Sequence, residues 1–580
     1  MSPGHTTSWR TTMSFDLVIR GGHVVDGSGA PVRRADVGIL GDRIAAVDAG
    51  LGAGREEIDA RDRIVTPGFI DLHTHFDGQV TWSDRLTPSS ANGVTTVVTG
   101  NCGVGFAPCR PEDREDLISL MSGVEDIPEV VMAEGLPWDW ESFEDYLAAV
   151  DQRPHDVDIA ALVPHSALRV FVMGDRAIRR EDANDDDITR MADLMRVAMA
   201  CGAAGFATSR ALQHRSSKGA PIPTVRAAEN ELQAIASVLK TAGRGVFQLL
   251  SDFDLYADIE GEFAMFRRLV ETSGRPLMFT LQQKHNDPDQ WRHLLALSET
   301  ANDQGLPIRP QVHSRPSGLL LGLELSRNPF SACPSVEALQ PLSFGARLTA
   351  LRDGGMRGTV LAEARAGGAH GIDWTRMFRI SDRPDYEPPA SESIALLSAA
   401  AGVDPAEYAL DLMLAGDGRA ILLAAAQNFA EGSLEPTREM ITHRDTLIAL
   451  GDAGAHCGLL CDGSYTTTLL THWTRDRTRG PKVSLEWAVK SMTSEPAKAI
   501  GLSDRGEVRE GLRADLNVID YARLEQRAPH VVYDLPTGGR RIVQEAVGYD
   551  ATLLAGQVTY RHGRAVGPTP GRVVRLGQEQ

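Results

Sequence analysis

The chain has 580 residues, of which 42% are hydrophobic and 24% are charged, as in a globular protein with one large domain and a smaller one. Its formal net charge of −19 argues against nucleic acid as a partner, because binding to phosphates needs a basic face. There is no apolar run of the roughly 18 residues that a membrane span needs, and six cysteines do not suggest a disulfide framework. We therefore expect a cytoplasmic protein without a membrane partner.

The N-terminal region predicts a leader followed by antiparallel strands. Residues 1–14 are polar, and we expect them to be disordered. Phe15–Arg20 alternates apolar and polar residues, which is typical of a half-buried strand. Farther on, Val37–Leu40 and Arg43–Asp48 are separated by a Gly-Asp pair, which indicates a hairpin.

The middle of the chain alternates strand and helix patterns. Asp185–Ala200 illustrates the helices, since acidic residues begin it and its apolar residues share one face. Strand–helix alternation repeated eight times predicts a (β/α)₈ TIM-type barrel over residues 67–505. The eight expected strands are Gly68–His75, Thr95–Gly100, Ile159–Pro164, Gly205–Thr208, Gly245–Leu250, Pro276–Leu281, Ile308–His313 and Leu447–Asp452.

Two further segments complete the expected organisation. Residues 314–446, between the seventh and eighth strands, are expected to be an insertion able to cover the mouth of the barrel. In residues 506–575, Ala514–Asp520 and Thr552–Arg561 each predict a strand. Because small hairpins are not stable alone, we expect residues 15–66 and 506–575 to pack together as one small β-sandwich. The fold class is thus α/β.

The strongest chemical motif is an apolar strand that ends in His73-Thr74-His75. Residues i and i+2 of a strand face the same side, so both imidazoles point the same way. At the C-terminal end of a barrel strand, that side is the site of chemistry. Two neutral imidazoles there suit Zn²⁺, although two unrelated surface histidines are the alternative.

Two other strand ends carry candidate metal ligands. Cys102 follows the second expected strand beside glycines that permit a tight turn, and a thiolate binds Zn²⁺ well. A small buried cysteine is the alternative. Asp452 ends the eighth strand, where a carboxylate is able both to bind metal and to accept a proton from water. An Asp in a Gly-rich turn is the alternative there.

The motifs together resemble a known group. The segments VTPGFIDLHTHFD, GVTTVVTGNCGVGFAP, GDAGAH and LEWAVKSMTSEPAKAIGLSDRGEVREGLRADLNVID are similar to those of the N-acyl-D-amino-acid deacylase (D-aminoacylase) group of the amidohydrolase superfamily. The resemblance runs from about residue 15 to 565. It implies the barrel, the small β-domain, one or two zinc ions and hydrolysis of an amide bond. It also implies His73, His75 and Asp452 as metal ligands, Asp452 as general base, and Cys102 as a ligand where many relatives have a carbamylated lysine.

The sequence departs from this group at the fifth and sixth strands. The group has a histidine ligand at the end of each, whereas our alignment places Leu250 and Leu281 there, and leucine does not bind metal. We therefore expect one Zn²⁺ rather than two, held by His73, His75, Asp452 and Cys102. A shift of register would instead bring in other residues, and His313 at the end of strand seven is a further substitute. The alternatives brought in by that shift are Gln248, Gln282, Lys284 and His285.

Several polar residues near strand ends are candidates for binding the substrate. A guanidinium binds a carboxylate in a bidentate manner, and the other cations bind it as point charges. Each residue taken singly is as well explained by an ordinary structural role. The candidates are His165, Arg210, His214, Lys284, His313, Arg315 and His456.

These features predict a metal-dependent amidohydrolase that cleaves a C–N amide bond of an N-acyl amino acid or similar small molecule. A hydrolase of a cyclic amide or lactone on the same site is one alternative, because fold and metal do not fix the substrate. A metal-free binding protein with a decayed site is another. The chain is also expected to be able to form a homo-oligomer.

Overall fold

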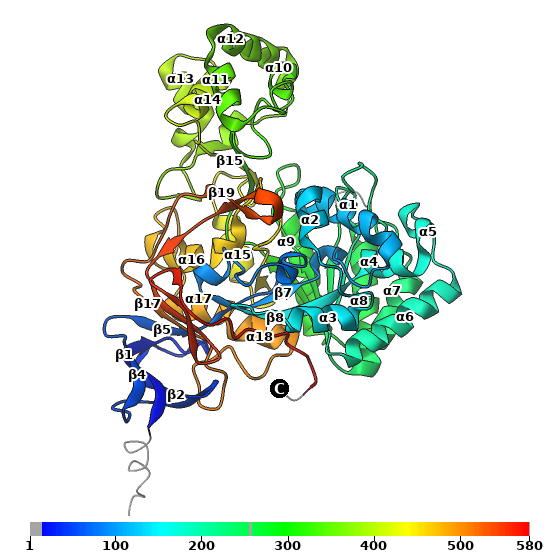
Figure 1. Cartoon of the computed structure of the whole chain (residues 1–580), viewed down its shortest axis with the longest axis vertical. Coiled ribbons are helices and arrows are strands. Elements are labelled where there is room, and N and C mark those ends of the chain that lie inside the picture. The colour runs from blue at the N-terminus through cyan, green and yellow to red at the C-terminus, as the bar shows by residue number, and fades with distance from the viewer. Residues whose placement is uncertain (1–13, 254–257, 370, 579–580) are drawn as a thin grey trace, which may run out of the picture.

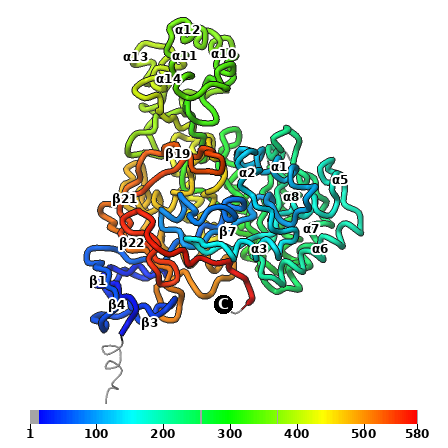
Figure 2. The backbone as a smooth tube through the Cα atoms, in the orientation of Figure 1, coloured from blue at the N-terminus to red at the C-terminus, as the bar shows by residue number. Residues whose placement is uncertain are grey.

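The computed structural model describes residues 14–253, 258–369 and 371–578 (Figures 1 and 2). The expected leader, apart from Ser14, lies outside the described residues. Eight parallel strands form one sheet in chain order, and they match the eight expected strands with shifted ends. They are β6 (Phe69–Asp71), β7 (Val94–Thr99), β8 (Asp158–Pro164), β9 (Gly205–Ser209), β10 (Val246–Leu250), β11 (Leu277–Thr280), β12 (Ile308–Val312) and β16 (Leu447–Ile448).

The two edges of this sheet meet just beyond β6 and β16. Thr74 and Ala453 form a parallel bridge, and the backbone N–H of His75 donates to Ala453 O at 2.8 Å. The N–H of Asp452 donates to His73 O at 3.1 Å. The sheet is therefore barrel-like, and its closure brings together segments that are far apart in the sequence.

The eighth strand is shorter than the sequence predicted. The expected strand ran to Asp452, but β16 ends at Ile448 because Leu450 and Asp452 take φ angles of 65° and 42°. An extended strand does not continue through left-handed residues. The chain beyond β16 is therefore a loop.

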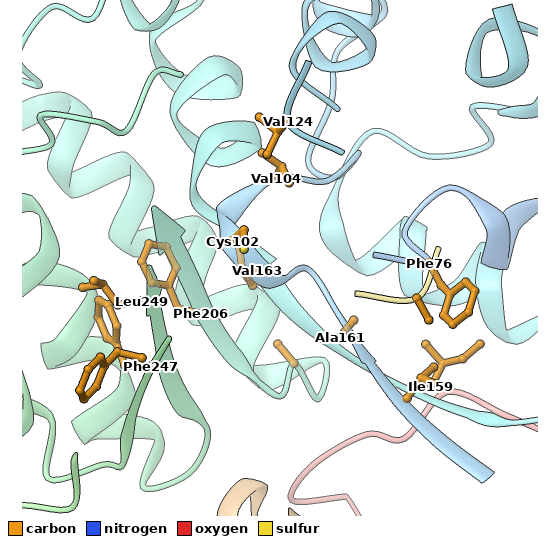
Figure 3. Close-up of a cluster of buried hydrophobic side chains, with 14 of the residues drawn as sticks. Phe76, Cys102, Val104, Val124, Ile159, Ala161, Val163, Phe206, Phe247 and Leu249 are labelled. Carbon is orange, nitrogen blue, oxygen red and sulfur yellow. The ribbon is translucent and has the colours of Figure 1, made fainter. Parts of the chain in front are cut away.

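Helices cover the outside of the barrel-like sheet. In α6 (Asp185–Ala200), whose bounds agree with the expected helix, Asn184 and Asp187 form a reciprocal capping box. Apolar side chains on the outer face of the strands pack against the helices; Figure 3 shows part of this cluster, including Phe206 of β9 and Phe247 of β10. The other helices of this layer are α1 (Arg114–Glu125), α2 (Glu129–Gly135), α3 (Phe143–Asp151), α4 (His165–Met173), α5 (Asp175–Ile178), α7 (Glu229–Ala242), α8 (Ile259–Ser273), α9 (Gln290–Asp303), α16 (Tyr465–Thr468), α17 (Leu485–Met492) and α18 (Ser494–Ile500).

Strands from both ends of the chain pair in a second sheet of nine strands. They join where β5 (Ile64–Pro67) lies antiparallel to β17 (Leu516–Ile519). The N-terminal members are β1 (Phe15–Val24), β2 (Arg33–Leu40), β3 (Arg43–Asp48) and β4 (Gly54–Asp59), and the C-terminal ones are β22 (Tyr549–Leu554), β23 (Gln557–Arg561) and β24 (Arg564–Ala565). The expected β2–β3 hairpin is confirmed.

One expected strand of this sheet is two strands. Thr552–Arg561 was predicted as a single element, but the chain reverses between β22 and β23. Ala555 and Gly556 have φ angles of 51° and 74°, the pair of left-handed residues that a two-residue hairpin turn requires. Glycine favours this turn, whereas alanine gives no sign of it in the sequence.

The insertion between β12 and β16 forms a lobe with its own hydrophobic core. Its helices project from the rest of the chain (Figure 1), while its base contacts the loop after β16, since Leu320 N–H donates to Leu459 O at 2.7 Å. The lobe contains β13 (Ser317–Leu321), β14 (Met377–Arg379), β15 (Leu422–Gln427), α10 (Pro334–Glu337), α11 (Phe344–Arg352), α12 (Gly354–Glu363), α13 (Ile394–Ala401) and α14 (Pro405–Leu414), and α15 (Glu435–Ile441) follows it.

Two short ladders remain: β18 (Glu525–Gln526) with β21 (Ala546–Val547), and β19 (His530–Leu535) with β20 (Gly539–Val543). The hairpin of β19 and β20 reaches the loop after β16, where Ile542 N–H donates to Cys457 O at 2.8 Å. Within the described residues, none of the helices has the length and apolar character needed to cross a membrane.

Candidate metal centre

His73 and His75 lie at the end of β6 and are buried, with exposed fractions of 1% and 2%. Their ring centroids are 5.4 Å apart. His73 Nδ1 contacts Gln311 Oε1 at 2.8 Å; since that oxygen accepts, the ring donates from Nδ1 and leaves Nε2 free to bind a metal. Burial lowers the pKa of His73 to about 4 and that of His75 well below its usual value. Both rings are therefore neutral at pH 7, as metal ligands must be.

Cys102 follows β7 in a tight turn. Its own φ is 54°, and the glycines on the way into and out of the turn, Gly100 and Gly103, have φ angles of 82° and 67°. A Cβ on Gly103 would lie 2.8 Å from the backbone of Thr208, so the chain passes too close to β9 for a side chain. This turn brings Cys102 Sγ to 3.3 Å from His73 Nε2. Burial raises the pKa of the thiol well above 9.

Asp452 reaches the same point from the loop after β16. Its Oδ1 lies 3.5 Å from His73 Nε2 and 3.8 Å from His75 Nε2. Burial raises the pKa of its carboxyl group to about 6, with His456 opposing the shift. Its φ of 42° is unusual for a residue other than glycine, Asn or Asp, and backbone strain of this kind clusters at functional sites.

The donor atoms fit a tetrahedral metal ion. Ligand atoms of His73, His75 and Cys102 lie within 4.8 Å of one another, the one such group of three found among the described residues. Asp452 is outside that group but close to both imidazoles: its Oδ1 lies 3.5 Å from His73 Nε2 and 3.8 Å from His75 Nε2, while Cys102 Sγ lies 3.3 Å from His73 Nε2. A tetrahedral zinc site with bonds of about 2.0–2.3 Å separates its donors by about 3.3–3.8 Å. Two imidazoles, a thiol and a carboxylate are also the donor set that Zn²⁺ favours.

Three polar side chains contact these candidate ligands. Gln311 of β12 holds His73, and Gln248 Oε1 of β10 accepts from the backbone N–H of Cys102 at 3.1 Å. Glu125, the last residue of α1, places its Oε1 3.4 Å from His75 Nδ1. The sequence interpretation missed Gln311, although it lies two residues before His313 on an expected strand and so on the same face. It also missed Glu125, which no pattern marks.

At strand five the structure places a glutamine rather than a leucine beside the site. Leu281 is buried in the cluster between strands and helices, and Leu250 packs against the same cluster. The polar side chain that reaches the candidate ligands is Gln248, as in the alternative register. Gln282 and His285 contact the insertion instead, through Ser317 and Ala425.

Of the substrate-binding candidates, His214 and His456 lie at the edge of this cluster. His456 Nε2 lies 3.5 Å from Glu125 Oε2, and burial lowers its pKa. His214 accepts from or donates to Ser209 Oγ at 3.0 Å. Burial lowers its pKa to about 3, with smaller contributions from His456 and His73. A small cleft opens beside Asp452 and is lined in part by Gln79, Asp462 and Arg541.

The other candidates are held in internal contacts. His313 Nε2 lies 3.6 Å from Asp462 Oδ2, and Arg315, which is fully buried, donates to Ser464 Oγ at 2.6 Å. His165 contacts Thr208 at 2.8 Å and Glu231 at 2.6 Å, and Arg210 pairs with Glu262 at 2.8 Å. Lys284 is half-buried. These contacts account for His165 and Arg210 as structural residues.

Comparison with known proteins agrees with this geometry. The model of the Amidohydrolase family matches residues 56–560. N-acyl-D-glutamate deacylase of Alcaligenes xylosoxydans xylosoxydans is 28% identical over 97% of this chain and 96% of its own. D-aminoacylase of the same organism is 42% identical, but the match covers only 33% of this chain and 37% of that protein. A solved structure of D-aminoacylase, described for its binuclear metal centre, is 26% identical with a TM-score of 0.64, covering 97% of this chain and 100% of that one. The chain therefore belongs to the Amidohydrolase family and is a hydrolase that acts on C–N amide bonds.

Proposed function

We propose that this chain is a zinc-dependent deacylase that cleaves the amide bond of an N-acyl amino acid or a similar N-acyl compound. The observation that carries the proposal is the convergence of His73, His75 and Cys102, whose ligand atoms lie within 4.8 Å of one another, with Asp452 Oδ1 3.5 and 3.8 Å from the two imidazoles. The substrate class is suggested by the names of two relatives, D-aminoacylase and N-acyl-D-glutamate deacylase.

These four residues would hold a single Zn²⁺. A bound zinc ion supplies Lewis-acid activation of water and of the scissile carbonyl. Within the described residues no second group of three candidate ligands is found, and β10 and β12 present the carboxamides of Gln248 and Gln311, which already hydrogen-bond to Cys102 and His73. Carboxamide oxygens are weaker ligands for zinc than imidazole or thiolate.

Asp452 would be the general base. With a pKa of about 6, its carboxyl group is mostly ionised at pH 7 and remains close enough to neutrality to pass a proton on. It would accept a proton from the attacking water and deliver it to the leaving nitrogen. His214 and His456, at the edge of the cluster, would contact the substrate.

The same proposal assigns roles to the rest of the chain. Residues 67–505 would form the catalytic barrel, and residues 15–66 and 506–575 would form one small β-domain beside it. The pairing of β5 with β17 supports this division, because it joins the two terminal segments.

Metal content per chain tests the proposal. Plasma mass spectrometry on protein purified without chelators should find about one zinc in the wild type and in the control His293→Ala, whose side chain is on the surface. His73→Ala should lose the zinc. Asp452→Asn should lower turnover of N-acyl amino acids by about 10²–10⁴-fold. A wild type without zinc would contradict the proposal, and two zinc ions per chain would contradict the single-ion part.

A further inference from the structure

Glu125 is a buried carboxylate whose position needs an explanation. It is 2% exposed and lies at the C-terminal end of α1, where the helix dipole disfavours a negative charge. Burial also disfavours that charge and, together with the nearby Asp452 and Asp77, raises the pKa of Glu125 well above its usual value. The partners that the structure gives its side chain are two imidazoles. His75 Nδ1 lies 3.4 Å from Oε1, and His456 Nε2 lies 3.5 Å from Oε2.

The two nitrogens of His75 face different carboxylates. Nδ1 faces Glu125 at 3.4 Å, and Nε2 faces Asp452 at 3.8 Å, on the side where His73 and Cys102 converge. His75 Nδ1 is buried and has no hydrogen-bond partner among the described residues, so Glu125 is the group placed to accept its proton. A neutral imidazole carries one proton, and a proton on Nδ1 leaves Nε2 as the donor to a metal. Gln311 likewise favours a proton on Nδ1 of His73, because its Oε1 accepts from that nitrogen.

Glu125 also joins two segments of the site. Its backbone oxygen accepts from the N–H of His456, in addition to the contact between their side chains. His456 has a φ of 50° and belongs to the loop that carries Asp452. The end of α1 is thus attached both to the ligand after β6 and to the loop after β16.

We propose that Glu125 is a positioning residue, which fixes the tautomer and orientation of His75 with Nε2 directed at the metal and couples this ligand to the Asp452 loop through His456. The inference rests on the proposed role of His75 as a zinc ligand. Residues that orient a histidine ligand in this way typically contribute about 10–100-fold to metal affinity.

Zinc affinity, measured by competition with a chromophoric chelator, tests this inference. Glu125→Gln keeps the shape and removes the group that can ionise and accept the proton of His75 Nδ1, and zinc should bind about 10–100-fold more weakly. Glu134→Gln, on the exposed side of the neighbouring α2, should match the wild type. The unfolding midpoint of the metal-free variant should not fall, because burial raises the pKa of Glu125 and so disfavours the charge that glutamine lacks. Unchanged zinc affinity in folded Glu125→Gln would overturn the proposal, whether or not stability changed.

A second measurement uses only the wild type. In the zinc-loaded protein labelled with ¹⁵N-histidine, Nδ1 of His75 should carry a proton and Nε2 should bind the metal. A deprotonated Nδ1 would overturn the proposal even if Glu125→Gln failed to fold. If the wild type bound no zinc, the proposed function itself would fail, which is distinct from a zinc-binding wild type whose affinity does not depend on Glu125.

Discussion

Zinc binding should release protons from particular residues, and the pH dependence of binding should identify them. Cys102 is a protonated thiol in the metal-free protein, because burial raises its pKa well above 9. As a zinc ligand it must be a thiolate. At pH 7.5, binding should therefore release one proton more from the wild type than from Cys102→Ser, and zinc affinity should fall as the pH falls.

Asp452 should release its proton in a lower pH range. With a pKa of about 6, its carboxyl group holds about 0.8 of a proton at pH 5.5 and about 0.03 at pH 7.5. The wild type should thus release about 0.8 of a proton more than Asp452→Asn at pH 5.5, and almost none more at pH 7.5. His73, whose pKa is about 4, should contribute little at either pH.

Isothermal titration calorimetry in buffers of different ionisation enthalpy counts these protons. Subtracting the proton release of each variant from that of the wild type removes the protons released by other buried acids near the site. Equal proton release by the wild type and Cys102→Ser at pH 7.5 would refute the assignment of Cys102 as a ligand. The excess of protons released by the wild type over Asp452→Asn should be larger at pH 5.5 than at pH 7.5. An excess that did not decrease between these pH values would refute the assignment of the lower-pH proton to Asp452.

Two further predictions concern metal affinity and stability. Gln311→Leu removes the acceptor for His73 Nδ1, so zinc should bind about 10–100-fold more weakly in a competition assay; unchanged affinity would show that the contact does not orient the ring. Arg477→Leu leaves the carboxylate of Glu387 buried without the guanidinium that now binds it at 2.9 and 3.0 Å, and should cost about 3–5 kcal/mol in guanidinium unfolding. Arg444→Leu, at an exposed ion pair, is the control and should leave the midpoint unchanged; equal effects of the two variants would contradict the argument.

The strands of the barrel-like sheet were predictable because parallel strands buried on both faces are short apolar runs. β8 (Asp158–Pro164) and β12 (Ile308–Val312) lie within one residue of their expected ends. Where the prediction was wrong, backbone conformation was the reason. Leu450, Asp452 and Ala555 have positive φ angles, which their residue types do not predict. The end of β16 and the hairpin of β22 and β23 were therefore not predicted.

The candidate ligands were predictable because each lies within four residues of the end of a strand. The end of a barrel strand limits where a side chain points, so His73, His75, Cys102 and Asp452 were expected to converge, and their donor atoms lie close together. Glu125 was not predictable, because it ends a helix and its approach to His75 depends on how α1 packs. The substrate-binding residues were the least predictable, since a cation near a strand end does not reveal its internal partner, as Arg210 and Glu262 show.

The meeting of the two sheet edges beyond β6 and β16 also sets an order of events during synthesis. His73 and His75 leave the ribosome early, whereas Asp452 follows only after the whole insertion has been made. The segment after β6 remains without its neighbour until Ala453 emerges, because that residue supplies the closing bridge. A nascent chain that stops within the insertion therefore contains three of the four proposed donors and lacks the proposed base, so on this proposal it would meet zinc before it could turn over substrate.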